Sequence, residues 1–250
     1  MFKMILNGYL GVMGGVIRAI QTGEHEIVAG ADVMPPGSAM PFPTYVNISD
    51  CDMPADVILD FSTASAVPNV LRYAEKRRVP VVICTTGLSD ATVEQLNECA
   101  KSVAVFHSAN MSLGINLLAS VVRKAALALS GFDVEIVEKH HNKKIDAPSG
   151  TAMLLAESIN DALDEKLSYV YDRTASRERR GENQIGIHSV RCGSVVGEHT
   201  VIFAGANEVL EFTHIAQSKE VFARGALRAA KYVKDKPPGL YAMRDIIEEL

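Results

Sequence analysis

The chain has 250 residues, of which 48% are hydrophobic and 22% are charged. This composition excludes disordered and fibrous classes, and the length suffices for one large domain or two small ones. The formal net charge of −5 argues against general affinity for nucleic acid, which needs a basic face. No apolar run reaches the roughly 18 residues of a membrane span, and the start lacks the pattern of a signal peptide, so we expect no membrane association.

Short apolar runs alternate with helical stretches in the first part of the chain. We predict strands at residues 2–7, 26–31, 57–61, 79–84 and 103–106, and helices at 12–21, 68–77 and 90–101. Residues 33–44 are rich in Pro and Gly and are predicted to form a loop. Strands that alternate with helices indicate βαβ units, so we predict an α/β fold with a Rossmann-like parallel sheet.

The pattern changes near residue 108. We predict helices at residues 113–129, 149–164 and 219–234, strands at 134–137, 185–192, 199–204 and 210–216, and a polar loop at 173–183. Three consecutive strands joined by short turns indicate an antiparallel or mixed sheet, so we predict a second, smaller domain of the α+β type with a mixed sheet. The pattern assigns no place to residues 237–250.

The four cysteines are scattered through the chain and form no CxxC motif; they are Cys51, Cys84, Cys99 and Cys192. Such scatter is typical of a reduced cytoplasmic protein with ordinary buried thiols. No neighbouring residue marks any of them as a nucleophile, so we expect a cytoplasmic location and no cysteine chemistry.

A glycine turn follows the first predicted strand, in Asn7-Gly-Tyr-Leu-Gly-Val-Met-Gly14. Gly8 can make the tight turn, Gly11 lets the backbone approach a pyrophosphate, and Gly14 lets the next helix pack closely on the sheet. The helix start then offers N–H groups to phosphates. The spacing is GxxGxxG rather than the commoner GxGxxG, and glycines also mark ordinary strand–helix turns, so this signal alone is weak.

Asp32 ends the second predicted strand, close to the roughly 20-residue offset of the acid that binds a ribose in this fold. The alternative is a solvated turn aspartate. A carboxylate accepts hydrogen bonds from ribose hydroxyls but repels a 2′-phosphate, and residues 33–36 contain no cation. We therefore predict that NADH is preferred and that NADPH is possible.

Three more loops follow predicted strands, where open parallel sheets bind ligands. They are residues 61–63, 84–87 and 108–111, with the sequences Phe-Ser-Thr, Cys-Thr-Thr-Gly and Ser-Ala-Asn-Met. Thr and Asn side chains there can contact the ribose and the nicotinamide amide. Alone these are ordinary turn residues, and only their place after the strands supports the prediction.

Residues 139–144 hold two histidines and three lysines, after the strand predicted at 134–137. A basic run is commonly a solvated face. This one leads directly into Asp146-Ala-Pro-Ser-Gly-Thr151, where Pro148 suits the first turn of a helix. A helix start binds carboxylates, and nearby cations attract them. The combination indicates a small substrate with one or more carboxylates.

Metal binding is the alternative use of His140 and His141. Adjacent residues on an extended chain point to opposite sides, and no further His or Cys ligand lies at a suitable spacing. We therefore predict no metal site. A hydride added to a C=C or C=N bond requires a proton, which His140 or Lys144 can supply.

The stretch from Glu135 to Ala152, EIVEKHHNKKIDAPSGTA, resembles the signature of the dihydrodipicolinate reductase family. The resemblance continues at residues 189–199, 211–214, 222–226 and 239–243, and so covers essentially the whole chain. It implies the NAD(P)H-dependent reduction of 4-hydroxy-tetrahydrodipicolinate, via dihydrodipicolinate, to the small dicarboxylate tetrahydrodipicolinate on the diaminopimelate route to lysine.

The resemblance also implies roles for particular residues. His140 would be the proton donor or acceptor and Lys144 a second proton donor, while substrate carboxylates would contact His141, Gly150 and Thr151. The dinucleotide-binding positions would be Gly8, Tyr9, Leu10, Gly11, Val12, Met13, Asp32, Cys84, Thr85, Thr86, Ser108, Ala109, Asn110 and Met111.

The domain plan implied is a dinucleotide-binding domain over residues 1–108, to which 218–250 return, and a substrate-binding and oligomerisation domain over 109–217. The family implies a homotetramer assembled through the substrate domains. Val12 stands where the family usually has Arg, and the loop after the second strand has no basic residue; both departures favour NADH.

Two other functions are less well supported. A dehydrogenase of an amino-acid semialdehyde would need a catalytic Cys or a Lys–Asp pair in another context, and the sequence has neither. A nucleotide sensor without turnover is opposed by the pair His140 and Lys144.

Overall fold

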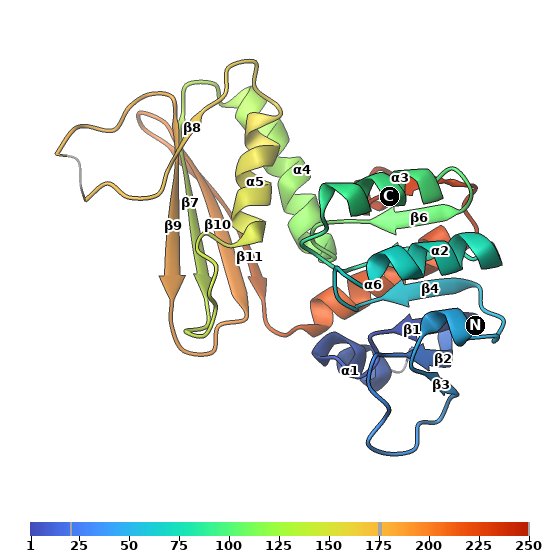
Figure 1. Ribbon diagram of the computed structural model, residues 1–250. Coiled ribbons are helices and arrows are strands. Elements are labelled where there is room, and N and C mark those ends of the chain that lie inside the picture. The colour runs from blue at the N-terminus through green and yellow to red at the C-terminus, as the bar shows by residue number, and fades with distance from the viewer. Residues whose placement is uncertain (21, 175–176, 250) are drawn as a thin grey trace. The chain divides into compact units, whose positions relative to one another are not determined.

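The computed structural model describes residues 1–20, 22–174 and 177–249. It divides into two compact units, one formed by Met1–Ser112 with Lys219–Leu250 and the other by Leu113–Ser218. Each unit has its own sheet (Figure 1). The predicted fold class, a Rossmann-like parallel-sheet domain plus an α+β domain with a mixed sheet, is confirmed. Within the described residues, no helix is long and apolar enough to cross a membrane.

The first unit contains a seven-stranded sheet in the order β12-β6-β5-β4-β1-β2-β3, with every pair parallel. Its strands are β1 (Phe2–Asn7), β2 (His25–Ala31), β3 (Thr44–Tyr45), β4 (Val57–Asp60), β5 (Val81–Ile83), β6 (Ala104–His107) and β12 (Gly239–Tyr241). Its helices are α1 (Val12–Ala19), α2 (Val67–Arg77), α3 (Asp90–Cys99), α6 (Glu220–Val233) and α7 (Met243–Glu248), with a 3-10 turn at Ile48–Asp50.

The central strands of this sheet are buried on both faces, which explains their continuous apolar runs. Helix α2 packs with α3, and α1 packs with α6. The order in which the chain adds strands reverses at β1. Strands β2 and β3 lie on one side of β1, whereas β4, β5 and β6 lie on the other, so the switch point falls between β1 and β4. Dinucleotides bind at such a switch point, outside the carboxyl ends of the strands.

The short strands β3 and β12 were not predicted. Each has only two or three residues, too few to show a periodic pattern, and each is an edge strand stabilised by a distant partner. The pairing of β12 with β6 places the end of the chain in the first unit. Helix α1 ends at Ala19, earlier than predicted, and residue 21 of that prediction lies outside the described residues.

The second unit contains a five-stranded mixed sheet in the order β11-β10-β7-β9-β8. Its strands are β7 (Asp133–His140), β8 (Ser168–Val170), β9 (Gln184–Arg191), β10 (Gly197–Ala204) and β11 (Val209–Ala216). Strand β10 is antiparallel to β7 and β11, whereas β9 is parallel to β7 and β8. Helices α4 (Leu113–Ala128) and α5 (Gly150–Asn160) pack together and share an apolar core with the sheet.

Four details of the second unit differ from the prediction. Strand β7 lies between β9 and β10, so these consecutive strands are not neighbours. Strand β7 also continues to His140, because pairing on both sides sustains it through polar residues. Helix α5 ends at Asn160, before the predicted end at residue 164, and the short strand β8 was missed.

Candidate active site

The end of strand β7 carries two polar side chains on its buried face. Residues along the strand alternate in burial, and Glu138 and His140 continue the face that begins with Val134 and Ile136. Glu138 is 0% exposed and His140 is 8% exposed. Because side chains two residues apart in a strand share a face, this carboxylate and this imidazole are held side by side.

Glu138 joins three parts of the second unit. Arg191 donates through both terminal nitrogens, Nη1 to Oε2 at 2.8 Å and Nη2 to Oε1 at 2.7 Å. The backbone N–H of Ser149 donates to Oε1 at 3.1 Å, and Nδ1 of His140 lies 2.6 Å from Oε2. Burial alone raises the pKa of Glu138, but these hydrogen bonds, led by those from Arg191, outweigh it and hold the pKa at about 2.

The ionised Glu138 decides where His140 carries its hydrogen. A carboxylate only accepts, so Nδ1 is the protonated nitrogen and Nε2 is left for other partners. Burial lowers the pKa of His140, against the opposite effect of Glu138. Nε2 lies close to β10, since a Cβ added to Gly197 would be 3.1 Å from it. A side chain at this glycine would therefore press on the imidazole.

The start of α5 lies next to this pair. Ser149 caps the helix by accepting the Ala152 N–H at 3.1 Å, and its hydroxyl lies 3.0 Å from Nε2 of His199. Burial lowers the pKa of His199 to about 3, so this imidazole is neutral. Gly150 and Thr151 form the first turn, and a Cβ added to Gly150 would meet no atom within 4 Å. A helix start of this kind can bind anions, and here the Gly150 backbone N–H already donates to the Asp146 carboxylate.

Lys144 and His141 lie on the turn between β7 and α5. The Lys144 N–H donates to the His141 carbonyl at 3.1 Å, and Lys144 Nζ pairs with Asp146 at 2.7 Å. The His141 Nδ1 is buried without a hydrogen bond. Lys139 pairs with Glu198 at 2.5 Å, so the predicted cationic cluster is partly neutralised by neighbouring carboxylates.

The structure therefore brings the five predicted catalytic and substrate-binding residues onto one continuous segment, between the end of β7 and the start of α5. Sequence reasoning gave no role to Glu138, Arg191 or His199. Glu138 was detectable from its spacing of two from His140 in a strand, but Arg191 and His199 reach the site from other strands. Within the described residues, no group of three or more His, Cys, Asp or Glu side chains could hold a metal ion.

The first unit has a pocket of about 790 Å³ at the carboxyl ends of β1, β2 and β4. It includes the predicted cofactor residues Gly8, Leu10, Gly11 and Asp32. The rest of the lining is formed by Asn7, Val33, Met34, Val46, Asn47, Ile48, Phe61, Ser62, Thr63, Ser65, Ala66, Asn69 and Val70. None of these residues is a cation.

The glycine turn is close-packed. Gly8 has a φ of +79°, and a Cβ there would lie 2.5 Å from the Phe61 carbonyl oxygen. A Cβ on Gly14 would lie 2.3 Å from the Gly8 oxygen, so the helix can approach only because the residue is glycine. The Leu10 N–H donates to Asp32 Oδ2 at 3.0 Å, which fixes the carboxylate beside the turn. These residues fit a dinucleotide, with phosphates at the turn and a ribose at Asp32.

The other predicted cofactor residues lie outside the lining of this pocket: Tyr9, Val12, Met13, Cys84, Thr85, Thr86, Ser108, Ala109, Asn110 and Met111. Tyr9 is fully buried and packs edge-on against Phe42, so only its backbone can reach a ligand. Val12 is exposed. Residues 84–86 follow β5 and 108–111 follow β6, at the same edge of the sheet.

Asp60 is a residue of this unit that sequence reasoning missed. It ends β4, is 0% exposed, and accepts hydrogen bonds from Asn7, Ser62 and Thr85 at 2.6–2.7 Å. Burial raises its pKa, although these hydrogen bonds act in the opposite direction. The strand predicted at 57–61 includes Asp60 as an interior residue, and nothing in the local sequence gives it a separate role.

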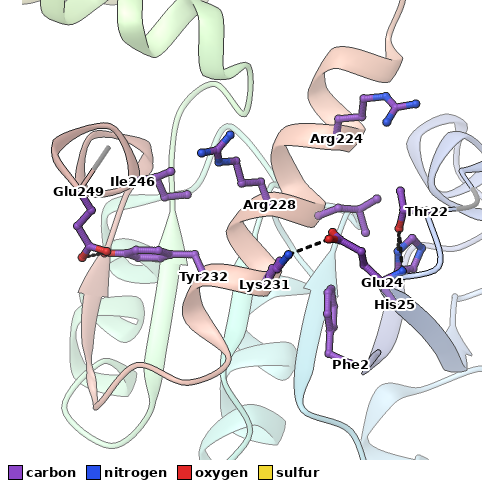
Figure 2. Close-up of a pocket in the computed structure, with 11 residues that line it drawn as sticks. Phe2, Thr22, Glu24, His25, Arg224, Arg228, Lys231, Tyr232, Ile246 and Glu249 are labelled. Atoms are coloured by element: carbon purple, nitrogen blue, oxygen red, sulfur yellow. Dashed lines mark hydrogen bonds and ion pairs between the residues drawn. The ribbon is translucent and has the colours of Figure 1, made fainter.

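A second pocket of the first unit, of about 490 Å³, includes Phe2 and His25, at the amino ends of β1 and β2 (Figure 2). Its charged side chains are largely satisfied within the unit: Lys231 pairs with Glu24, and Tyr232 donates to Glu249. Ligands of open parallel sheets bind at the opposite, carboxyl edge. Of the two pockets, the larger one therefore lies at the edge where a dinucleotide would bind.

A Rossmann-like unit with a glycine turn, joined to a unit with a buried Glu–His pair at an anion-binding helix start, defines a two-domain oxidoreductase. A family model described as "Dihydrodipicolinate reductase, N-terminus" matches residues 2–111, and one described as "Dihydrodipicolinate reductase, C-terminus" matches residues 114–247. The chain belongs to the dihydrodipicolinate reductase family, which confirms the resemblance found in the sequence.

Individual relatives support this family assignment. The 4-hydroxy-tetrahydrodipicolinate reductase of Caldanaerobacter subterraneus subsp. tengcongensis is 50% identical over 253 residues, which cover 100% of this chain and 99% of that protein. The enzyme of the same name from Clostridium novyi is 47% identical over 99% of each chain. A dipicolinate-bound dihydrodipicolinate reductase from Paenisporosarcina sp. TG-14 has the same fold, with a TM-score of 0.79, 24% identity and 97% coverage of both chains.

Proposed function

We propose that the chain catalyses the NAD(P)H-dependent reduction of 4-hydroxy-tetrahydrodipicolinate, via dihydrodipicolinate, to tetrahydrodipicolinate in lysine and diaminopimelate biosynthesis. The observation that carries this proposal is the single Glu138 carboxylate, which bonds both His140 and the start of α5. One group thereby couples a proton-handling side chain to an anion-binding helix start. The dipicolinate bound to the Paenisporosarcina reductase supports a small dicarboxylate substrate for this chain.

The start of α5 is the proposed carboxylate site. The backbone N–H groups of Gly150 and Thr151 lie in the first helical turn, where the helix dipole favours negative charge. The unpartnered Nδ1 of His141 is a further polar group at this segment that a substrate carboxylate would satisfy. These three residues orient the substrate, and the ring then lies beside the end of β7.

His140 and Lys144 are the proposed proton-handling groups. When bound, the reduced dinucleotide supplies a hydride from C4 of the nicotinamide, and the reduced ring needs one proton to balance the added hydride. His140 holds its Nδ1 hydrogen toward Glu138, which leaves Nε2 as the atom that exchanges a proton with substrate. Lys144, whose ammonium is held by Asp146, is the second donor and also attracts the dianionic substrate.

The first unit is the proposed dinucleotide-binding domain, and the second is the proposed substrate-binding and oligomerisation domain. The pocket lining supports a preference for NADH over NADPH. Asp32 faces the position expected for the adenosine ribose, and the pocket lining contains no Lys, Arg or His to neutralise a 2′-phosphate. We expect kcat/KM to be higher with NADH, and a clearly higher value with NADPH would refute this role of Asp32.

We propose a homotetramer assembled through the second unit, in a cytoplasmic location. Large apolar side chains are exposed on its edge strand β11, with Val209 at 60%, Ile215 at 59% and Leu210 at 43%. Exposed apolar groups of this size mark interfaces. The four free cysteines suit a reducing compartment. Sedimentation equilibrium tests the assembly, and a stable monomer at micromolar concentration would contradict it.

The proposed reaction is tested by mixing the purified protein, NADH and freshly prepared substrate, and following the loss of NADH absorbance. We expect turnover that depends on both the protein and the dicarboxylate. If NADH binds but is not oxidised, the chain is a nucleotide-binding protein without this activity. If NADH is oxidised only with an amino-acid semialdehyde, the substrate assignment is wrong.

A further inference from the structure

Asp60 is a buried carboxylate whose hydrogen-bond partners are all neutral. Its Oδ1 accepts the Ser62 hydroxyl at 2.6 Å and the Asn7 amide Nδ2 at 2.7 Å, and its Oδ2 accepts the Thr85 hydroxyl at 2.7 Å. The side chain is 0% exposed. A buried charge is costly even when hydrogen-bonded, and the preceding residues of β4 are fully buried and apolar. The sheet does not need this charge in order to pack.

The location of Asp60 points to the nucleotide site. Asp60 ends β4, Asn7 ends β1, and the two residues are paired in the sheet register at the switch point. Both Asn7 and Ser62 line the pocket of about 790 Å³. The carboxylate itself is covered, so it acts on a ligand through these two neighbours.

Asp60 determines which way its neighbours form hydrogen bonds. An ionised carboxylate only accepts, and a serine hydroxyl has one proton to give. With that proton directed to Asp60, the Ser62 oxygen offers only lone pairs to the pocket. The Asn7 amide is oriented in the same way, because its nitrogen faces Asp60 and its carbonyl oxygen faces elsewhere. The Ser62 hydroxyl oxygen is therefore an acceptor surface on this side of the pocket.

The acceptor surface completes a pattern across three neighbouring strands. Strand β1 lies between β4 and β2, and it leads into the glycine turn, whose N–H groups are donors. Asp32, an acceptor, directly follows β2. Asp60 is the last residue of β4, and Ser62 lies just after that strand. The order acceptor, donor, acceptor matches the order ribose, pyrophosphate, ribose of a dinucleotide.

We propose that Asp60 is a specificity-determining residue, which holds Ser62 as a hydrogen-bond acceptor for the hydroxyls of the nicotinamide ribose and disfavours phosphate at that position. This inference rests on the proposed dinucleotide-binding function, and it assigns to the β4 side a ribose that is distinct from the one at Asp32. Asp60 is a positioning residue, because it acts through Ser62.

The test is a double-mutant cycle on NADH binding, followed by NADH fluorescence. Asp60→Asn keeps the shape, but an amide must donate through one of its two atoms, so a neighbouring hydroxyl has to turn round. Ser62→Ala removes the acceptor. We expect each single variant to raise the Kd for NADH about tenfold. The double variant should also have a Kd for NADH raised about tenfold rather than a hundredfold, because the two changes remove the same contact.

Asp56→Asn is the matched control. It removes a carboxylate just before the opposite end of the same strand, where Asp56 accepts the Lys3 N–H at 2.7 Å, far from the carboxyl edge. Its Kd for NADH should stay within about twofold of the wild-type value. The thermal unfolding midpoint of Asp60→Asn should not fall, because the change removes a desolvated charge. A loss of binding together with unchanged stability is an outcome that a purely structural role would not give.

Fragment binding keeps the inference testable if Asp60→Asn does not fold. Ser62→Ala should weaken reduced nicotinamide mononucleotide about tenfold and leave competition by inorganic pyrophosphate unchanged. The inference is overturned if Ser62→Ala leaves the mononucleotide unaffected, if Asp60→Asn binds NADH like the wild type, or if the two effects multiply. Failure of the wild-type protein to bind NADH would instead overturn the proposed function.

Discussion

Glu138 in the second unit and Asp60 in the first unit are both completely buried, yet their pKa values move in opposite directions. Glu138 receives two hydrogen bonds from the Arg191 guanidinium, and its pKa falls to about 2. Asp60 receives hydrogen bonds only from neutral groups, and burial raises its pKa. The partners account for part of this difference, because Glu138 is paired with a guanidinium whereas Asp60 receives hydrogen bonds only from neutral groups.

The two carboxylates also act on their neighbours in opposite ways. Glu138 keeps a hydrogen on Nδ1 of His140 and so leaves the other ring nitrogen for the proposed proton exchange. Asp60 accepts a hydrogen bond from the Ser62 hydroxyl, whose oxygen is then left as an acceptor in the lining of the larger pocket. A buried carboxylate paired with a cation can therefore support acid–base chemistry, whereas one without a cation can define the polarity of a binding pocket.

The largest expected effect concerns the proposed proton-handling residues of the second unit. His140→Ala and Lys144→Ala should each lower kcat by about 10²–10⁴-fold, because each removes a general acid–base group. The Kd for NADH should stay within about twofold, since the nucleotide pocket is in the other unit. Lys143→Ala is the matched control, because Lys143 is exposed, and its kcat should be nearly unchanged. A loss of less than about threefold would remove the mutated residue from the mechanism.

The next effect tests whether Glu138 depends on its cation. Arg191→Ala should lower the free energy of unfolding by about 3–5 kcal/mol, because it leaves a buried charge without its ion pair. Adding Glu138→Gln to that variant should recover part of the loss, since the unpaired charge is then gone. Urea unfolding measures both, and Arg224→Ala, which breaks only an exposed pair, is the control at about 0.5 kcal/mol or less. Equal losses for the two arginine variants would show that Glu138 does not need its cation.

A smaller effect tests the position of His140. Gly197→Ala places a Cβ about 3.1 Å from Nε2 and should shift the imidazole by a few tenths of an ångström. We expect a loss of about tenfold in kcat, because small misplacements of catalytic groups are costly. Gly37→Ala adds a Cβ where no atom lies within 4 Å and should leave kcat unchanged. A Gly197→Ala variant with wild-type kcat would mean that the orientation of His140 is not critical.

The smallest effect is the pH dependence of stability, which should have opposite signs at the two carboxylates. The folded-state pKa of Glu138 lies below its ordinary value of 4.5, so its stabilisation is present above pH 4.5 and is lost as the pH falls toward about 2. Asp60 has a raised pKa, so its contribution falls as the pH rises above its ordinary 3.8. Urea unfolding across this pH range measures the free energy of unfolding. As the pH falls, this free energy should decrease less in Glu138→Gln than in the wild type, and more in Asp60→Asn. If both variants changed the pH dependence of the unfolding free energy in the same direction relative to the wild type, the opposite roles of the two carboxylates would be contradicted.

The sequence was sufficient for features that depend on neighbouring residues. The alternation of strands and helices, the glycine turn and the segment from His140 to Thr151 are local patterns, and the structure brings Gly8, Gly11 and Asp32 into one pocket. The segment also contains its own helix start, so the residues proposed for catalysis and carboxylate binding lie close together in the sequence.

The sequence was insufficient where a contact joins distant strands. Arg191 is 53 positions from Glu138, and Asp60 is 53 positions from Asn7, so neither partnership leaves a local pattern. The strand β7 was predicted to end at residue 137, because polar residues were taken as its end rather than as part of a buried face. The insertion of β7 between β9 and β10 likewise depends on pairing that no single segment encodes.

The most direct test of the central claim, that this chain transfers a hydride from the dinucleotide to the dicarboxylate ring, uses NADH deuterated at the transferable C4 position. Mass spectrometry of the product should find one deuterium in tetrahydrodipicolinate with the wild-type protein. Lys144→Ala should give the same labelled product, only more slowly. Oxidation of NADH without deuterium in the ring would contradict the claim.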